Sequence, residues 1–225
     1  MIRRAASAAM LAAAACRGGA SQAQQFDGAQ AHRWVEYMVA AGPRIPNTAA
    51  HRAIGDWLVQ ELGRRADTVM VQEWVHVTRH GDSLHLRNIF ARFKPAEASR
   101  VLYVSHWDSK PHATMDPDPA KRGDPVPGAN DGGSSTAMLL GVADELKKQP
   151  PALGVDLLFV DGEDYGEFDG NEEDNLIGAR WFAAHMPAGY VPLFGVLWDM
   201  IGDYDQEFPQ EGYSRQHAPE VVRRV

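Results

Sequence analysis

Near the middle of the chain stands Val155-Asp156-Leu157-Leu158-Phe159-Val160-Asp161-Gly162-Glu163-Asp164, an apolar run that passes directly into acidic residues. Its apolar part, residues 155–160, is typical of a strand that is buried on both faces of a sheet. Two further apolar runs, at residues 101–105 and 194–198, have similar length and character. Helical segments separate the runs, so the sequence predicts β-α-β units and a largely parallel sheet.

The segments around these runs complete the expected architecture. Residues 68–77 and 84–93 are rich in β-branched and aromatic side chains and predict a hairpin at the edge of the sheet. Apolar residues at helical spacing predict four helices. The first spans residues 31–41, and the second begins after a cap at Asn47 or Thr48. The third spans residues 134–148, and the fourth spans residues 175–186 with Asp174 as its cap. The expected fold is an α/β three-layer sandwich, in which a central, mostly parallel mixed sheet carries helices on both faces.

The N-terminal segment differs in composition from the rest of the chain. Arg3-Arg4 precedes a short, alanine-rich apolar run, which is the pattern of an export signal. Cleavage after Ala23 is the favoured expectation, and a lipoprotein signal that ends at Cys16 and leaves a lipid anchor there is the alternative. The sequence therefore predicts a signal peptide at residues 1–23 and one catalytic domain at residues 24–225, exported from a bacterial cytoplasm to the periplasm or the medium.

Composition narrows the class of partner. The chain has 225 residues, 44% of them hydrophobic, and a formal net charge of -8. Nucleic acid is not an expected partner, because phosphate backbones are bound by clustered Lys and Arg. A transmembrane span is not expected either, because no apolar run approaches the roughly 18 residues that a spanning helix needs. Cys16 is the only cysteine and lies in the signal segment, so the expected domain contains no disulfide.

Polar side chains follow each of the three expected strands. In open α/β sheets, ligands bind outside the carboxyl ends of the strands, so groups at these ends are expected to meet in space. A further aspartate lies in the glycine-rich loop before residues 134–148. The side chains expected to converge are His106, Asp108, Asp131, Asp161, Glu163, Asp164 and Asp199.

One imidazole and several carboxylates are suitable ligands for zinc, which in catalytic sites keeps about three protein ligands and one open position. Glu163 and Asp164 are neighbours in a turn and can point in different directions. Asp164 can then hold the metal while Glu163 serves as general base. Each residue alone has an ordinary explanation, such as a helix cap for Asp131 or a solvated charge for Glu163. Their joint position at strand ends favours a metal site.

Four motifs in order resemble a known family. They are Ser105-His106-Trp107-Asp108-Ser109-Lys110, Gly128-Ala129-Asn130-Asp131, Asp161-Gly162-Glu163-Asp164-Tyr165-Gly166, and Trp198-Asp199-Met200-Ile201-Gly202. This succession resembles the glutaminyl cyclases of the animal and bacteroidete type, which share the fold of the zinc aminopeptidases. The resemblance extends from about Trp34 to the end of the chain.

The resemblance implies a set of metal ligands. In that family, a single zinc is held by an aspartate of the Gly-Ala-x-Asp loop, an acidic residue of the Glu-Glu or Glu-Asp pair, and a late histidine. Asp131 and Asp164 match the first two. The late histidine is expected beyond Val225, in a chain that appears truncated at its C-terminus, and His217 is not assigned as a ligand.

The resemblance also implies roles for the other residues. Glu163 matches the residue that shuttles a proton, and Asp199 matches a member of the hydrogen-bond network around the reacting centre. His106 and Asp108 match positions that bind and support a second metal in the aminopeptidases. The resemblance therefore implies a second-metal position for His106 and a supporting role for Asp108.

The expected activity is zinc-dependent cyclisation of an N-terminal glutamine to pyroglutamate with release of ammonia, so the expected partners are peptides or proteins that begin with Gln. One zinc is expected. The alternative enzyme is a zinc aminopeptidase with two zincs, in which Glu163 activates a water molecule. A third hypothesis is an inactive fragment or a non-catalytic peptide-binding protein.

Overall fold

In a computed structural model of the chain, residues 26–167 and 173–225 are described. Among them, five strands form one mixed sheet in the order β1-β2-β4-β3-β5. The strands are β1 (Thr68–Val77), β2 (Ser83–Phe93), β3 (Arg100–His106), β4 (Gly154–Val160) and β5 (Gly195–Leu197). Strands β3, β4 and β5 run parallel, whereas β1 and β2 form an antiparallel hairpin that pairs with β4. The predicted hairpin and the predicted parallel strands are both present.

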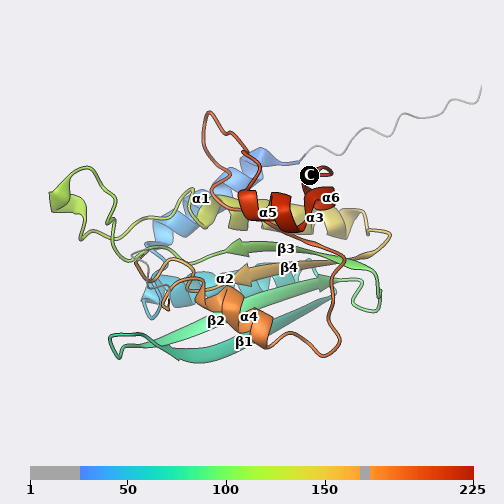
Figure 1. Cartoon of the computed structure of the whole chain (residues 1–225), viewed down its shortest axis with the longest axis horizontal. Helices are drawn as coiled ribbons and strands as arrows, with labels where there is room; N and C mark the ends of the chain where they lie inside the picture. The colour runs from blue at the N-terminus through green and yellow to red at the C-terminus, as the bar shows by residue number, and fades with distance from the viewer. Residues whose placement is uncertain (1–25, 168–172) are drawn as a thin grey trace, which may run out of the picture.

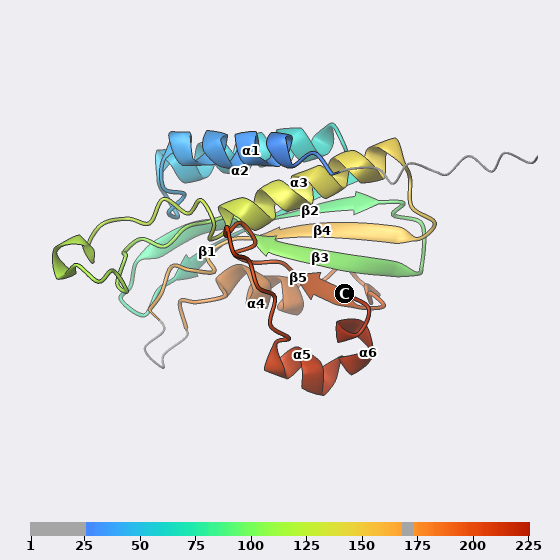
Figure 2. The same ribbon diagram turned by 90° about the horizontal axis from the view of Figure 1, so that it is seen from above.

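Helices cover both faces of the sheet. On one face lie α1 (Gly28–Ala41), α2 (Ala49–Gly63) and α3 (Gly133–Lys148), and on the other lie α4 (Ile177–Ala184), α5 (Gly212–His217) and α6 (Pro219–Val222) (Figures 1 and 2). A short 3-10 helix, η1 (Pro119–Lys121), lies in the long link between β3 and α3. The three-layer arrangement confirms the predicted fold class. The predicted signal segment and Cys16 lie outside the described residues.

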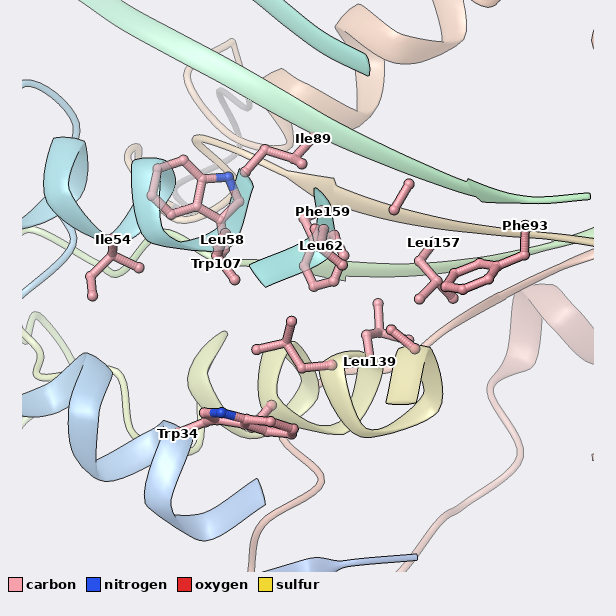
Figure 3. Packing of buried hydrophobic residues seen from close by; sticks show 14 of the residues in the cluster. Trp34, Ile54, Leu58, Leu62, Ile89, Phe93, Trp107, Leu139, Leu157 and Phe159 are labelled. Carbon is pink, nitrogen blue, oxygen red and sulfur yellow. The ribbon is translucent and has the colours of Figure 1, made fainter. Parts of the chain in front are cut away.

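The main hydrophobic core lies between the sheet and the first three helices. Figure 3 shows Leu58 and Leu62 of α2 and Leu139 of α3 beside Leu157 and Phe159 of β4. All of these side chains are fully buried. Strand β4 is buried along its whole length, as a continuous apolar run between two neighbouring strands predicts. This packing fixes the carboxyl ends of β3 and β4 side by side. No helix in residues 26–167 and 173–225 is long and apolar enough to cross a membrane.

Asp156 interrupts the apolar run of β4 and is fully buried. Its carboxylate accepts hydrogen bonds from Arg100 Nε at 2.5 Å and Nη2 at 2.6 Å, from Arg92 Nε at 3.2 Å and from the Tyr190 hydroxyl at 2.9 Å. Two arginines and a phenol thus replace the water that this carboxylate loses on folding. The network lies at the amino ends of the parallel strands, away from the acidic turns.

We expect Asp156→Ala to lower the free energy of unfolding by about 3–5 kcal/mol, because it leaves the buried Arg100 guanidinium without its charged partner. Chemical denaturation at equilibrium measures this change. The matched control is Asp56→Ala. The Asp56 side chain is 74% exposed and forms an ion pair with Arg87. Loss of such a surface pair costs less than about 1 kcal/mol. Equal effects of the two variants would contradict the importance of the buried network.

Several predicted helix boundaries were wrong. Helix α1 begins at Gly28 rather than residue 31, because the Asp27 side chain caps it by accepting from the Gln30 N–H. Of the two predicted caps of α2, Thr48 is confirmed. Helix α4 spans Ile177–Ala184 rather than 175–186, and Asp174 does not cap it.

The Asp174 carboxylate is occupied elsewhere. Asp174 Oδ1 lies 2.8 Å from His76 Nε2, and Oδ2 accepts the Arg79 N–H at 3.1 Å. Asp174 therefore ties the segment before α4 to the end of the β1–β2 hairpin. Leu176, with a positive φ of 53°, occupies the position just before the helix.

Candidate metal centre

The centre is built where β3 and β4 end next to each other. His106 is the last residue of β3 and pairs in register with Val160, the last residue of β4. Asp108 lies two residues beyond His106 and is fully buried. Its Oδ1 accepts the Glu163 N–H at 3.1 Å, and its Oδ2 accepts the Asp164 N–H at 3.2 Å. Asp108 therefore holds the turn that presents the two acidic residues after β4.

A glycine loop brings Asp131 to the same place. Gly132, which follows Asp131, has a positive φ of 69°, and a Cβ there would lie 2.7 Å from the Asp108 carbonyl oxygen and 2.9 Å from His106 Cε1. Only glycine allows this close approach. The Thr136 hydroxyl in the first turn of α3 donates to the His106 carbonyl oxygen at 2.9 Å and joins the loop and helix to β3.

Asp199 arrives from the segment after β5. The Gly202 N–H donates to Asn130 Oδ1 at 2.7 Å, and the Ile201 N–H donates to Ser134 Oγ at 3.1 Å. These bonds attach the segment to the glycine loop and to the start of α3. Sequence reasoning did not assign Asn130 and Ser134 a role, although Asn130 stands within the quoted Gly-Ala-Asn-Asp motif.

The structure brings the predicted residues together in two overlapping groups around one histidine. His106 forms one group with Asp131 and Asp164 and another with Glu163 and Asp199, and the ligand atoms of each group lie within 4.8 Å of one another. His106 Nε2 lies 2.9 Å from Asp131 Oδ1 and 3.4 Å from Asp199 Oδ1. The roles of these residues as ligands or catalysts stay predictions.

Two residues near the centre do not join it. The Asp161 carboxylate turns away and contacts His51 Nε2 at 2.9 Å through both oxygens, so its predicted convergence with the cluster was wrong. No local sequence pattern indicates a role for His51, which is buried and stacks on Trp107. His217 is exposed on α5 with its ring beside Tyr213, and it belongs to neither of the two groups in the described chain.

The donor atoms fit a zinc ion. Four buried side-chain atoms of the cluster make no hydrogen bond of normal geometry with the described residues, although two of them, His106 Nε2 and Asp199 Oδ1, lie 3.4 Å apart. The four atoms are His106 Nε2, Glu163 Oε2, Asp164 Oδ2 and Asp199 Oδ1. Buried polar atoms are nearly always satisfied, so unpaired atoms grouped around one point indicate a missing partner. One imidazole nitrogen and several carboxylate oxygens are the ligands that catalytic zinc takes in proteins.

The electrostatics of the cluster also indicate a bound cation. Burial raises the pKa of Glu163 to about 7 and that of Asp164 to about 7. The neighbouring carboxylates contribute to both shifts, because they oppose a further negative charge. Burial alone would lower the pKa of His106, but the carboxylates of Asp108, Asp131 and Asp199 raise it well above its ordinary value. Carboxylates crowded in this way repel one another unless a cation lies among them, so a divalent ion suits the centre.

Comparison with known proteins gives the family of the chain. It belongs to peptidase family M28, whose family model matches residues 88–224. A probable zinc metalloprotease of Leptosphaeria maculans is 29% identical over an alignment of 161 residues, which covers 67% of this chain and 34% of that protein. The chain thus spans about a third of the length of that curated relative.

Solved structures of two kinds are similar to the chain. A Zn-dependent exopeptidase from Parabacteroides distasonis is 38% identical with a TM-score of 0.85, covering 89% of this chain and 70% of that one. A glutaminyl cyclase from Bacteroides thetaiotaomicron is 36% identical with a TM-score of 0.85, covering 88% and 70%. A leucine aminopeptidase precursor from the same organism has the same identity, coverage and TM-score. These findings confirm the predicted resemblance and support zinc.

Proposed function

We propose that the protein is a zinc-dependent glutaminyl-peptide cyclotransferase, which converts an N-terminal glutamine to pyroglutamate and releases ammonia. The observation that carries this proposal is the carboxylate of Glu163, which has a buried, unpaired oxygen beside the group that fits zinc. A carboxylate in this position is suited to accept and return a proton during the reaction.

Asp131 and Asp164, the two ligands that the family resemblance implies, would hold the ion. Among the described residues, His106 is the histidine whose ligand atom lies within 4.8 Å of theirs, so it would serve as a further ligand in place of its expected second-metal role. A bound zinc would supply Lewis-acid polarisation of a carbonyl oxygen. Asp108 contacts two members of this set. Its Oδ1 lies 3.4 Å from His106 Nδ1, and its Oδ2 accepts the Asp164 N–H. Such supporting contacts orient the groups that bind a metal.

The proposed reaction moves one proton within one substrate residue. The α-amine nitrogen attacks the side-chain carboxamide carbon, and the bond from that carbon to its nitrogen breaks. Glu163 takes a proton from the attacking amine and returns it to the departing nitrogen, which leaves as ammonia. Because nucleophile and electrophile belong to the same residue, the enzyme gains mainly by holding them in the reactive orientation. The atoms balance without water.

The rival function is a zinc aminopeptidase, in which Glu163 would take a proton from water. It is favoured by Asp199, which lies 3.4 Å from His106 Nε2 and offers, with His106, ligands for a further ion. The leucine aminopeptidase precursor also supports it. The cyclase is supported by likeness to glutaminyl cyclases from Bacteroides thetaiotaomicron, Tannerella forsythia and Porphyromonas gingivalis at 36–38% identity.

The two functions predict different products from synthetic peptides. We expect the zinc-loaded protein to release ammonia from peptides that begin with Gln without shortening them, and to leave peptides that begin with Leu or Ala unchanged. An ammonia assay and mass spectrometry of the same reaction measure both outcomes. Release of free amino acids from the Leu and Ala peptides at a comparable rate would contradict the cyclase proposal and support the aminopeptidase.

A further inference from the structure

Arg44 lies far from the metal centre in sequence and is fully buried behind it. It belongs to the link between α1 and α2, directly after Gly42 and Pro43. Its N–H donates to Ser109 Oγ at 2.8 Å, and the Ser109 N–H donates to the Arg44 carbonyl oxygen at 3.3 Å. These bonds fix the backbone of Arg44 next to the segment that follows β3.

The guanidinium of Arg44 joins the two segments that carry the cluster. Nε donates to the Trp107 carbonyl oxygen at 2.7 Å, between His106 and Asp108. Nη1 donates to the Pro127 carbonyl oxygen at 3.1 Å, and Nη2 donates to that of Gly128 at 2.6 Å and, more weakly, to that of Asp131 at 3.5 Å. One planar, rigid group therefore sets the spacing between the segment after β3 and the loop of Asp131.

All of these acceptors are main-chain oxygens. No carboxylate in the described part of the chain lies within ion-pair distance of Arg44, so the carboxylates of Asp108 and Asp131 stay available to His106 and to an ion. Burial lowers the pKa of Arg44, while the charges of Asp108 and Asp131 oppose this shift. A buried charge with only carbonyl partners is costly, and its value must lie in what it holds in place.

The glycine loop is shaped around this side chain. Gly128 has a positive φ of 67°, and a Cβ there would lie 2.5 Å from Arg44 Nη2 and 2.8 Å from Ser109 Cβ. A side chain at this position would have to displace the guanidinium. Arg44 and Gly128 therefore form one fitted unit, although they lie 84 residues apart in the chain.

We propose that Arg44 is a positioning residue of the metal centre, which holds the Asp131 loop at the distance from His106 that one ion requires. This inference rests on the zinc binding in the proposed function and is independent of the substrate. Arg44 has no contact with the reacting atoms in this role and acts through the backbone of the loop.

Zinc affinity of the purified protein, measured by competition with a chelator, tests the role directly. We expect Arg44→Lys and Arg44→Met each to weaken zinc binding by about 10–100-fold, the range for groups that support metal ligands. Lysine keeps the charge but cannot reach the four carbonyl oxygens that the guanidinium contacts, so it is not expected to restore affinity. Gly128→Ala is expected to weaken binding similarly, and the double variant Arg44→Met with Gly128→Ala should lose little more than either single variant.

The matched control is Arg100→Lys. Arg100 is also a buried arginine, 4% exposed, but it binds Asp156 at the other end of the strands. We expect this variant to unfold at a lower temperature with an unchanged zinc dissociation constant. Circular dichroism of the zinc-free proteins shows which variants fold. If Arg44→Met does not fold, Gly128→Ala still tests the proposal.

The outcomes separate this inference from the proposed function. Unchanged zinc affinity in folded Arg44→Lys and Gly128→Ala, or an equal loss in Arg100→Lys, would overturn the role of Arg44 alone. Failure of the unmodified protein to bind zinc would overturn the proposed function and this inference together. Tight zinc binding without cyclase activity would overturn the proposed reaction and leave the role of Arg44 intact.

Discussion

Replacement of Glu163 by glutamine is expected to leave zinc bound and to lower kcat by about 10²- to 10⁴-fold, the usual contribution of a positioned general base. Glutamine keeps the size and shape of the side chain but cannot accept the proton of the attacking amine. The Glu163 main-chain N–H donates to the Asp108 side chain, and this bond does not involve the Glu163 carboxylate, so the turn should keep its conformation.

The neighbouring residue supplies the matched comparison. Asp164→Asn also replaces a carboxylate by an amide in the same turn, and its N–H bond to Asp108 Oδ2 is likewise retained. Asp164→Asn is expected to lose zinc, whereas Glu163→Gln is expected to keep it. Zinc content after gel filtration and kcat from ammonia release measure the two effects separately. Loss of zinc in Glu163→Gln, with retention in Asp164→Asn, would mean that the two roles are exchanged.

The location of the centre could be predicted because it depends on local patterns and one topological rule. Buried strands have a clear signature in an apolar run such as residues 155–160, and parallel strands bring their carboxyl ends to one edge of the sheet. The residues that follow the strands must then lie near one another. His106, Glu163, Asp164 and Asp199 were placed in this way, and the glycines around Asp131 indicated a tight loop.

Other contacts could not be predicted because they join residues with no local signal. Asp156 looks like an exception within an apolar run, and only its neighbours Arg100 and Tyr190 explain it. Asp161 follows β4 just as the cluster residues follow their strands, yet its side chain turns towards His51, 110 residues away in sequence. The direction of a side chain after a strand depends on the loop, which the sequence pattern does not specify. No local pattern indicates a role for Arg44, and the proposed role follows from contacts with residues more than 60 positions away in sequence.

Asp131 is the charged ligand that the glycine loop contributes to the metal centre in the proposed function. Asp131→Asn is expected to weaken zinc binding by more than about 100-fold, beyond the range for supporting groups, because it removes a charged ligand. Cyclase activity at limiting zinc should fall with it. Zinc titration and metal analysis of the purified variants measure the change.

Asp199→Asn is a closely matched control, because both aspartates approach His106 Nε2, at 2.9 Å and 3.4 Å, and both side chains are 33% exposed. A cyclase needs one ion to polarise the carboxamide and has no need of a second to generate hydroxide. In that case, the unmodified protein binds one zinc, Asp199→Asn keeps it, and Asp131→Asn loses it. An aminopeptidase with two ions would instead show two zincs, one of which is lost in Asp199→Asn, because the second group of ligands includes Asp199. The zinc content of these two variants therefore decides between the functions without any substrate.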